Sequence, residues 1–241
     1  MRPMQPAWVL NRRPYGDNGF LLELFLGEDG RCSVVVRGAR RKRVGGHLAS
    51  LLQPFSPLLV SLAGRGELKS LRNVEAMFPS YKLRGDILMC GLYLNELLIR
   101  TLPRLDPCIE LFMCYGKTIE ALAEGILELA LRRFELAVIT ELGYQIVWNR
   151  DNLGHPIRTE KQDCFEVSRG FRMLENRVKS GCPLIGGHQL LSIDKWLQEG
   201  DELSSDNAAY LKKITRQAIN NLASGHEVNS RDLLRQLKGV Y

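Results

Sequence analysis

The pattern of hydrophobic and polar positions changes near residue 80. Before that point, apolar residues form short runs separated by turn residues, and after it they recur every three or four positions. Short runs bounded by Gly, Pro or Asp are typical of strands, whereas the longer spacing is typical of amphipathic helices. The pattern predicts a β domain over residues 1–80 and a helical domain over residues 81–241.

The β domain contains five segments with the pattern of strands. The second and third flank a Glu28-Asp29-Gly30 turn, and the Asp-Gly step is a strong hairpin signal. Five short strands in about 80 residues fit a small barrel. We predict an OB-fold, although an SH3-like barrel would give much the same pattern. The expected strands cover residues 7–10, 20–26, 32–36, 55–62 and 67–78.

The helical domain is expected to be all-α, with an irregular insertion over about 144–185, where Gly, Asn, Asp and Pro are frequent. Pro103 closes its first helix, Gly143 ends its third, and Ser230 is a candidate N-cap for its last. The fold class is therefore α+β with two domains. The expected helices cover about 87–102, 108–123, 127–142, 187–199, 206–223 and 231–237.

The excess positive charge lies entirely in the predicted β domain. Residues 1–80 contain 12 Lys or Arg and 6 Asp or Glu, whereas the remaining 161 residues contain 21 of each. A separate basic module indicates a polyanionic partner. Nucleic acid fits better than a membrane surface, because no basic amphipathic helix is visible.

The densest basic cluster follows the third expected strand. Five of the seven residues from 37 to 43 are basic, and no acidic residue occurs between Gly30 and Gly66. A glycine-containing loop can present several cations to phosphate oxygens at low steric cost. A solvated charged loop is the plain alternative, but its place in the basic domain favours nucleic-acid binding. The predicted phosphate contacts are Arg37, Arg40, Arg41, Lys42 and Arg43, extended by Arg31, Arg65 and Lys69.

Aromatic side chains on a small barrel can stack on unpaired bases. Phe20 and Phe25 lie in a strongly apolar strand and are expected in the core. Tyr15 follows two arginines and is the predicted stacking residue, with Arg13 as a neighbouring phosphate contact.

No set of catalytic or metal-binding residues stands out. Gly116-Lys117-Thr118 resembles the end of a phosphate-binding loop, but the glycine required five residues earlier is Leu111. The four histidines are isolated, and the six cysteines are scattered without a Cys-x-x-Cys pair. We therefore expect no metal, no cofactor and no enzymatic activity. Free thiols, with no visible signal peptide or membrane-spanning run, favour a cytoplasmic protein.

An arginine pair in the helical domain is a candidate partner site. Leu131, Phe134 and Val138 follow helical spacing and are expected in the core. Arg132 and Arg133 adjoin this apolar stripe, where an acidic peptide with a hydrophobic end could dock.

A family resemblance rests on an ordered set of short segments. In the β domain these are Val9-Leu10, Arg13-Pro14-Tyr15, Gly30-Arg31, Arg37-Gly38-Ala39-Arg40, Leu52-Gln53-Pro54-Phe55-Ser56-Pro57-Leu58 and Gly64-Arg65-Gly66-Glu67-Leu68-Lys69. In the helical domain they are Gly91-Leu92-Tyr93-Leu94-Asn95-Glu96-Leu97-Leu98, Leu131-Arg132-Arg133-Phe134-Glu135-Leu136, Leu142-Gly143-Tyr144 and Ser230-Arg231-Asp232-Leu233-Leu234-Arg235-Gln236. Each segment is weak alone, but the set spans nearly the whole chain and resembles the RecO family of bacterial recombination mediators.

The resemblance implies an OB-fold followed by a helical domain. It implies a protein that binds single- and double-stranded DNA, anneals complementary strands and, with RecR, helps to load RecA onto DNA coated by single-strand-binding protein. It also implies contact with the acidic C-terminal tail of single-strand-binding protein, for which Arg132 and Arg133 become the candidates, and a location at the nucleoid.

The chain departs from the family at one point. Some members carry a four-cysteine zinc site in the irregular part of the helical domain, but here that region contains only Cys164 and Cys182. The zinc is therefore not carried over. Two alternatives from other classes stay open, an OB-anchored nucleic-acid-processing enzyme and an RNA-binding scaffold.

Overall fold

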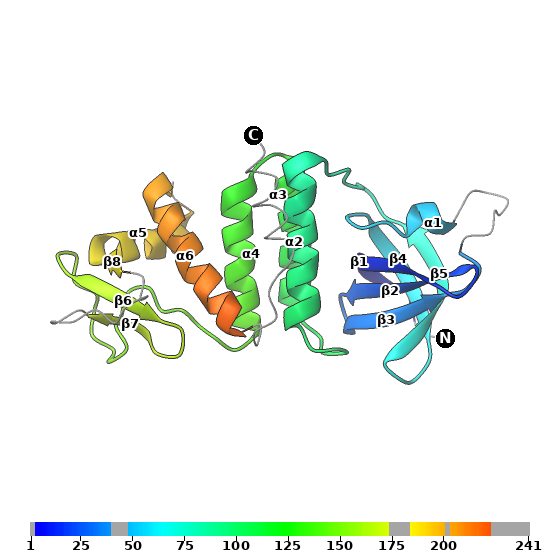
Figure 1. Cartoon of the computed structure of the whole chain (residues 1–241), viewed down its shortest axis with the longest axis horizontal. Helices are drawn as coiled ribbons and strands as arrows, with labels where there is room; N and C mark the ends of the chain where they lie inside the picture. Colours follow the sequence, from blue (N-terminus) through cyan, green and yellow to red (C-terminus); the bar gives the residue numbers. More distant parts are fainter. Residues whose placement is uncertain (1–2, 40–47, 174–183, 201–202, 223–241) are drawn as a thin grey trace. The chain divides into compact units, whose positions relative to one another are not determined.

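The chain divides into two compact units at the junction between Phe134 and Glu135, inside helix α4 (Leu127–Glu141). The structure, a computed structural model, describes residues 3–39, 48–173, 184–200 and 203–222. Figure 1 shows the order of the elements along the chain. The predicted domain boundary near residue 80 lies within the first unit, between its barrel and its helices, and stays a prediction.

Five strands at the start of the first unit close into a barrel. Neighbouring strands follow the order β1-β2-β3-β5-β4, and β4 returns to pair with β1. β3 and β5 are parallel, whereas the other neighbours are antiparallel. This closure is that of the OB-fold and confirms the predicted five-stranded barrel. The strands are β1 (Gln5–Tyr15), β2 (Gly19–Leu26), β3 (Gly30–Val36), β4 (Pro57–Ala63) and β5 (Leu68–Ala76).

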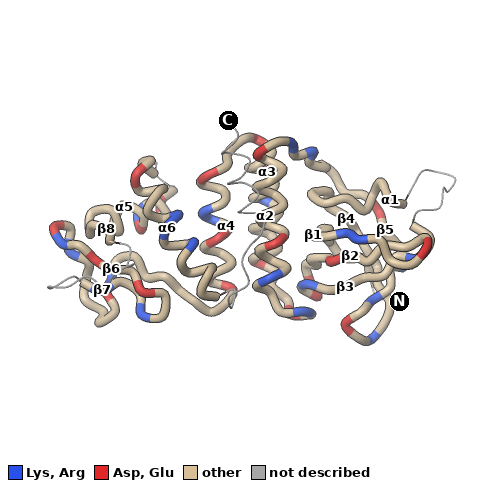
Figure 2. Tube along the Cα trace, in the orientation of Figure 1, with Lys and Arg blue, Asp and Glu red and all other residues tan. Residues whose placement is uncertain are grey.

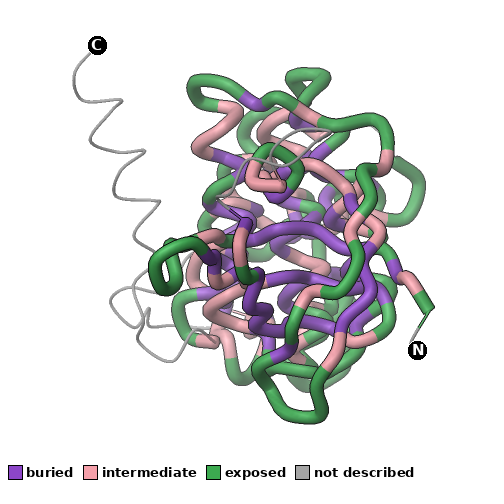
Figure 3. Tube along the Cα trace, turned by 90° about the vertical axis from the view of Figure 1, so that its right-hand side faces the viewer, coloured by how far each residue is buried: buried purple, intermediate pink, exposed green. Residues whose placement is uncertain are grey.

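Alternate residues of these strands fill the barrel. On β2, Leu22, Leu24 and Leu26 are fully buried, and Val34 of β3 lies in the same core. Burying a side chain of this size contributes about 1.5–3 kcal/mol, so the barrel interior is a major source of stability. Figure 3 shows buried stretches of the trace that alternate with exposed ones. Because side chains alternate, the odd-numbered residues of β2 and β3 point outward.

The first unit also contains helices, and those that follow the barrel largely match the predicted ones. Helix α2 ends at Thr101, just before Pro103, as the proline predicts. Gly116 to Thr118 lie inside α3, so they do not form a phosphate-binding loop. The helices are α1 (Leu48–Leu51), which was not predicted, α2 (Gly85–Thr101) and α3 (Ile109–Ala123).

The second unit combines helices with a small sheet. The helical character predicted for this part of the chain is confirmed by α5 (Gly187–Glu199) and α6 (Ser205–Leu222). The stretch expected to be irregular, however, contains three antiparallel strands in the order β7-β6-β8, which the prediction of an all-α domain did not include. Strands of three to five residues are too short to show alternation among so many turn residues. They are β6 (Gln162–Glu166), β7 (Gly170–Met173) and β8 (Leu184–Gly186).

One cysteine departs from the prediction of free thiols. Cys164 on β6 is disulfide-bonded, whereas Cys32, Cys90, Cys108 and Cys114 are free. A disulfide needs proximity in the fold, which scattered sequence positions do not reveal. Cys182 and the expected helix at 231–237 lie outside the described residues.

Candidate nucleic-acid interface

The outer face of the barrel has an apolar half that is covered by helices of the same unit. Trp8 of β1 meets Tyr115 edge-on, with ring centroids 5.4 Å apart, and Phe25 of β2 meets Phe112 at 5.3 Å. Both partner rings belong to α3. Because α3 packs on it, this half of the face is not accessible to a ligand.

The other half of the outer face is polar and open. A register shift between Val9 and Asn11 changes which residues of β1 point outward. From there Asn11, Arg13 and Tyr15 alternate along one side of the strand, and all three are exposed. Tyr15 is 49% exposed at the start of the β1–β2 turn. The structure therefore brings the predicted stacking residue and Arg13 onto one outer row.

The neighbouring Arg12 is used by the fold. Its Nη1 donates to the carbonyl oxygens of Ala49 and Leu52 at 2.7 and 3.2 Å, and its guanidinium lies 4.7 Å from the centre of the Phe20 ring. Arg12 thus ties α1 to β1, because it points to the opposite side of the strand from Arg13.

Two of the predicted phosphate contacts, Arg31 and Lys69, are buried side chains, and their role in DNA binding stays a prediction. Arg31 is 9% exposed, donates Nε and Nη2 to the carbonyl of Leu102 and pairs with Glu23 at 3.1 Å. Lys69 is 6% exposed, and its Nζ donates to the carbonyl of Gly64 at 3.3 Å. Both side chains are therefore held by bonds within the fold. The composition of the predicted β domain includes these two cations on β3 and β5, but it does not show in which direction their side chains point.

The remaining predicted cations divide between exposed positions and undescribed ones. Arg37 is exposed at the end of β3, and its Cα is 3.8 Å from the point where a Cβ on Gly19 would stand. It therefore lies next to the turn that carries Tyr15. Arg65 is exposed in the turn between β4 and β5. Their roles stay predictions, as do those of Arg40, Arg41, Lys42 and Arg43, which lie outside the described residues.

One cation beside the polar half was missed by the sequence analysis. Arg104 is 40% exposed in its side chain, and its Nη2 is 3.3 Å from Glu23. Its backbone bridges to Arg31 at the start of β3. A single arginine after Pro103, outside the predicted β domain, offers no sequence signal for this position. Figure 2 marks the Lys and Arg positions along the trace.

The predicted arginine pair on α4 splits into a buried and an exposed member. Arg132 is 3% exposed, and its Nε is 3.4 Å from Glu128 one turn earlier. Arg133 is exposed. Phe134 is fully buried, as predicted from the helical spacing. Because the side chain of Arg132 is buried, its burial favours Arg133 as the contact, and the assignment of both arginines stays a prediction.

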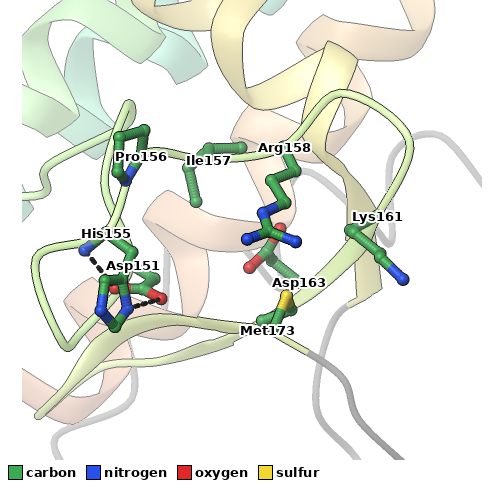
Figure 4. Close-up of a pocket in the computed structure, with 8 residues that line it drawn as sticks. All are labelled: Asp151, His155, Pro156, Ile157, Arg158, Lys161, Asp163 and Met173. Carbon is green, nitrogen blue, oxygen red and sulfur yellow. Dashed lines mark hydrogen bonds and ion pairs between the residues drawn. The ribbon is translucent and has the colours of Figure 1, made fainter.

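A pocket in the second unit contains a histidine–carboxylate pair (Figure 4). His155 Nδ1 lies 3.3 Å from Asp151 Oδ2. Desolvation would raise the pKa of Asp151, but the N–H groups of His155 and Leu153 donate to its carboxylate and leave that pKa below its usual value. Burial raises the pKa of Asp163 in the same pocket. The described residues that line this pocket include no hydroxyl or thiol nucleophile. The Asp151 carboxylate holds a turn, because the N–H groups of Leu153 and His155 donate to it.

Neither a metal-binding cluster nor a membrane-spanning helix occurs among the described residues. They contain no group of three or more His, Cys, Asp or Glu side chains arranged to hold a metal ion. Among the described helices, none combines the length and the apolar character needed to cross a membrane.

The chain is similar to known proteins over nearly its whole length. Residues 1–79 match the family described as Recombination protein O N terminal, and residues 84–239 match Recombination protein O C terminal. A DNA repair protein RecO from Methylococcus capsulatus is 39% identical over 234 residues, which is 95% of this chain and 91% of that protein. A protein of the same name from Coxiella burnetii is 38% identical over 238 residues, covering 96% of this chain and 97% of the relative. Another from Halorhodospira halophila is 35% identical and covers 97% of both chains.

Proposed function

Because the chain belongs to the RecO family and so has a general role in DNA repair and recombination, we propose that it is a recombination mediator that acts by binding DNA rather than by making or breaking bonds. The observation that carries the proposal is the basic barrel itself. Its open outer row joins Arg13 to Tyr15, and Arg37 leads from the same end into the basic segment up to Arg43.

The proposed mechanism is charge neutralisation followed by pairing. Two DNA strands repel each other through their phosphates, and clustered arginines replace the counterions that would otherwise screen them. Exposed Tyr15 offers a ring on which an unpaired base can stack, which would hold a single strand with its bases accessible. Single- and double-stranded DNA would both bind, and complementary strands would anneal on the barrel.

The second half of the proposal concerns partners. The helical part of the chain would recognise the acidic C-terminal tail of single-strand-binding protein, with exposed Arg133 as the contact. With RecR, the protein would then help to load RecA onto the coated DNA. This proposed role on DNA would place the protein at the nucleoid.

The test is annealing of complementary strands that are first coated with single-strand-binding protein from the same organism. The proposed function predicts faster duplex formation than with coated strands alone, without nucleotide or metal added. Unchanged annealing of both coated and bare strands would contradict the proposal.

Two rival functions give different results in the same samples. A nucleic-acid-processing enzyme would convert labelled DNA into a shorter or modified product when divalent metal is added, and the proposed mediator leaves the label on intact strands. An RNA-binding scaffold would prefer structured RNA over single-stranded DNA in competition at physiological salt, and the mediator would not.

A further inference from the structure

A cleft of about 200 Å³ lies on the polar half of the barrel's outer face. Its walls come from β1, β2, β3, the end of α2 and the segment that follows α2. Three guanidinium groups and one carboxylate line it, so its local charge is positive. The lining residues are Asn11, Arg13, Leu21, Glu23, Arg31, Ile99 and Arg104.

The position of Arg104 is fixed by its backbone. The N–H of Leu105 donates to the carbonyl of Arg31 at 2.9 Å, so the segment after α2 lies against the first residues of β3. Gly30 permits this approach, because a Cβ there would stand 1.9 Å from the carbonyl oxygen of Asp106. The approach places the Arg104 guanidinium at the cleft wall.

Two carboxylates lie near Arg104: that of Glu23, which several donors share, and that of Glu67, which is exposed. Glu23 accepts from Arg31, Arg104 and the hydroxyl of Ser33. Glu67 lies 3.6 Å from Arg104, but its side chain is 72% exposed, and exposed pairs of this kind contribute little. A phosphate can therefore compete for Arg104 while Glu23 keeps the guanidinium in place.

Further donors converge on the same space. Arg13 is exposed at the cleft on β1. The side-chain oxygen of Asn11 accepts from the N–H of Arg12 at 2.8 Å, which leaves the amide nitrogen of Asn11 to donate. Two arginines and an amide match the oxygens of a phosphodiester group.

We propose that this cleft binds one backbone phosphate of a DNA strand, with Arg13 and Arg104 as its charged ligands. The inference rests on the proposed function and adds the path of the strand. From the cleft, the outer row of β1 leads two residues on to Tyr15, a step of about 6.6 Å along a strand. Arg37, beside Gly19, lies at the far end of that path. The proposed path of the DNA strand thus runs from Arg104 along the outer face of β1 to Arg37.

The experiment measures binding of a fluorescein-labelled single-stranded oligonucleotide by the full-length protein over a range of salt concentrations. Arg13→Gln and Arg104→Gln are each expected to weaken binding about three- to tenfold, and to reduce the slope of log affinity against log salt by about 0.7. The matched control is Arg72→Gln, which removes the same charge from an exposed position on β5 outside the cleft. It should leave both quantities near wild type.

A second variant separates phosphate binding from a structural role. Arg104→Lys keeps the charge and should recover most of the salt slope that Arg104→Gln loses. Urea unfolding of all variants shows whether the fold is retained. If the wild type binds DNA while Arg13→Gln and Arg104→Gln match Arg72→Gln, the cleft is not a phosphate site and the proposed function survives. If the wild type does not bind the oligonucleotide, both fail.

Discussion

Asn95, in the middle of α2, donates its side-chain amide to the main-chain carbonyl of Leu10 at 2.9 Å. The accepting carbonyl belongs to the residue at which the register of β1 shifts against β2. Asn95 also accepts from the hydroxyl of Tyr115 at 2.6 Å. One buried amide therefore joins the barrel to two helices at the point where β1 changes from its covered half to its open half.

Asn95→Ala is expected to lower the free energy of unfolding by about 1–3 kcal/mol, because it leaves a buried carbonyl and a buried hydroxyl without that partner. The measurement is urea unfolding followed by circular dichroism. Asn149→Ala is the control, since Asn149 is exposed and its side-chain amide donates to Asp194 at 3.2 Å, an oxygen to which Gln198 donates as well. It should cost less than about 0.5 kcal/mol. Equal losses in the two variants would argue against a special role for the Asn95 link.

Gly30→Ala should destabilise the protein more than a positive φ angle alone explains. Gly30 has φ +69°, and a Cβ there would collide with the backbone of Asp106. Gly16→Ala is the matched control, because Gly16 has φ +59° and open space around it. The left-handed conformation costs about 1–2 kcal/mol in both variants, so thermal unfolding should show a clearly larger loss for Gly30→Ala. A similar loss in both would mean that the segment at Asp106 can move away.

The barrel could be predicted because its strands alternate cleanly. Leu22, Leu24 and Leu26 occur at every second position, and a strand with one buried face requires that pattern. The length of β1 could not be predicted, because its second half is polar on the outside and its alternation is interrupted at Leu10. The small sheet of the second unit was also not predicted, because strands such as β8 contain only three residues and are too short to show an alternating pattern.

The candidate site could be predicted only as far as composition allows. The basic segment at 37–43 and the pair Arg13 and Tyr15 follow from charge and position along the chain. Burial of Arg31 could not be anticipated, because its acceptor is the carbonyl of Leu102, 71 residues away. Arg104 reaches the same face through that long-range contact. The direction in which a side chain points and its neighbours in the fold, rather than its residue type, decide which arginines and lysines can reach DNA.

Replacing Arg40, Arg41, Lys42 and Arg43 together by Gln should flatten the salt dependence of DNA binding. Each phosphate contact that is lost lowers the slope by about 0.7 for single strands and about 0.9 for duplex DNA. The readout is anisotropy of labelled single- and double-stranded oligonucleotides between low and physiological salt. An unchanged slope on both substrates would move the main DNA contacts away from this segment.

Cys32 should resist modification in the folded protein. It is fully buried in the barrel core, and burial raises the pKa of its thiol to about 12, with the charge of Asp29 adding to the shift. At pH 8 only about one thiol in ten thousand is then ionised. Iodoacetamide labelling followed by peptide mass mapping should find Cys32 unmodified until urea is added, whereas the partly buried Cys114 should react before Cys32. Labelling of Cys32 at the rate of Cys114 in native buffer would show that the barrel opens.

The same thiol gives a pH dependence of stability. An unfolded cysteine loses its proton near pH 9, whereas folded Cys32 keeps it to about pH 12. The unfolded state therefore binds fewer protons in that window, so stability falls as the pH rises through it. In Cys32→Ala this part of the alkaline loss should disappear, although the variant starts from a lower stability because the core loses volume. Urea midpoints at pH 8 and pH 10 compare the two slopes.

Arg133→Glu should weaken binding of an acidic peptide that ends in an aromatic residue with a free carboxylate, the chemistry expected of the tail of single-strand-binding protein. An exposed guanidinium can hold a carboxylate through two hydrogen bonds, and reversal of its charge replaces attraction by repulsion. The loss should be at least tenfold in a peptide-binding titration. Binding of bare DNA should stay nearly unchanged, because Arg133 is on α4 and does not line the cleft proposed to bind DNA.

Arg132 provides the contrast for this prediction. Its side chain is buried against Glu128, so Arg132→Glu is expected to unfold or destabilise α4 rather than to act on the peptide alone. In Arg133→Glu, annealing of coated strands should fail while annealing of bare strands survives, and circular dichroism should match the wild type. A folded Arg133→Glu variant with wild-type affinity for the peptide would place the docking site on another surface of the helical region.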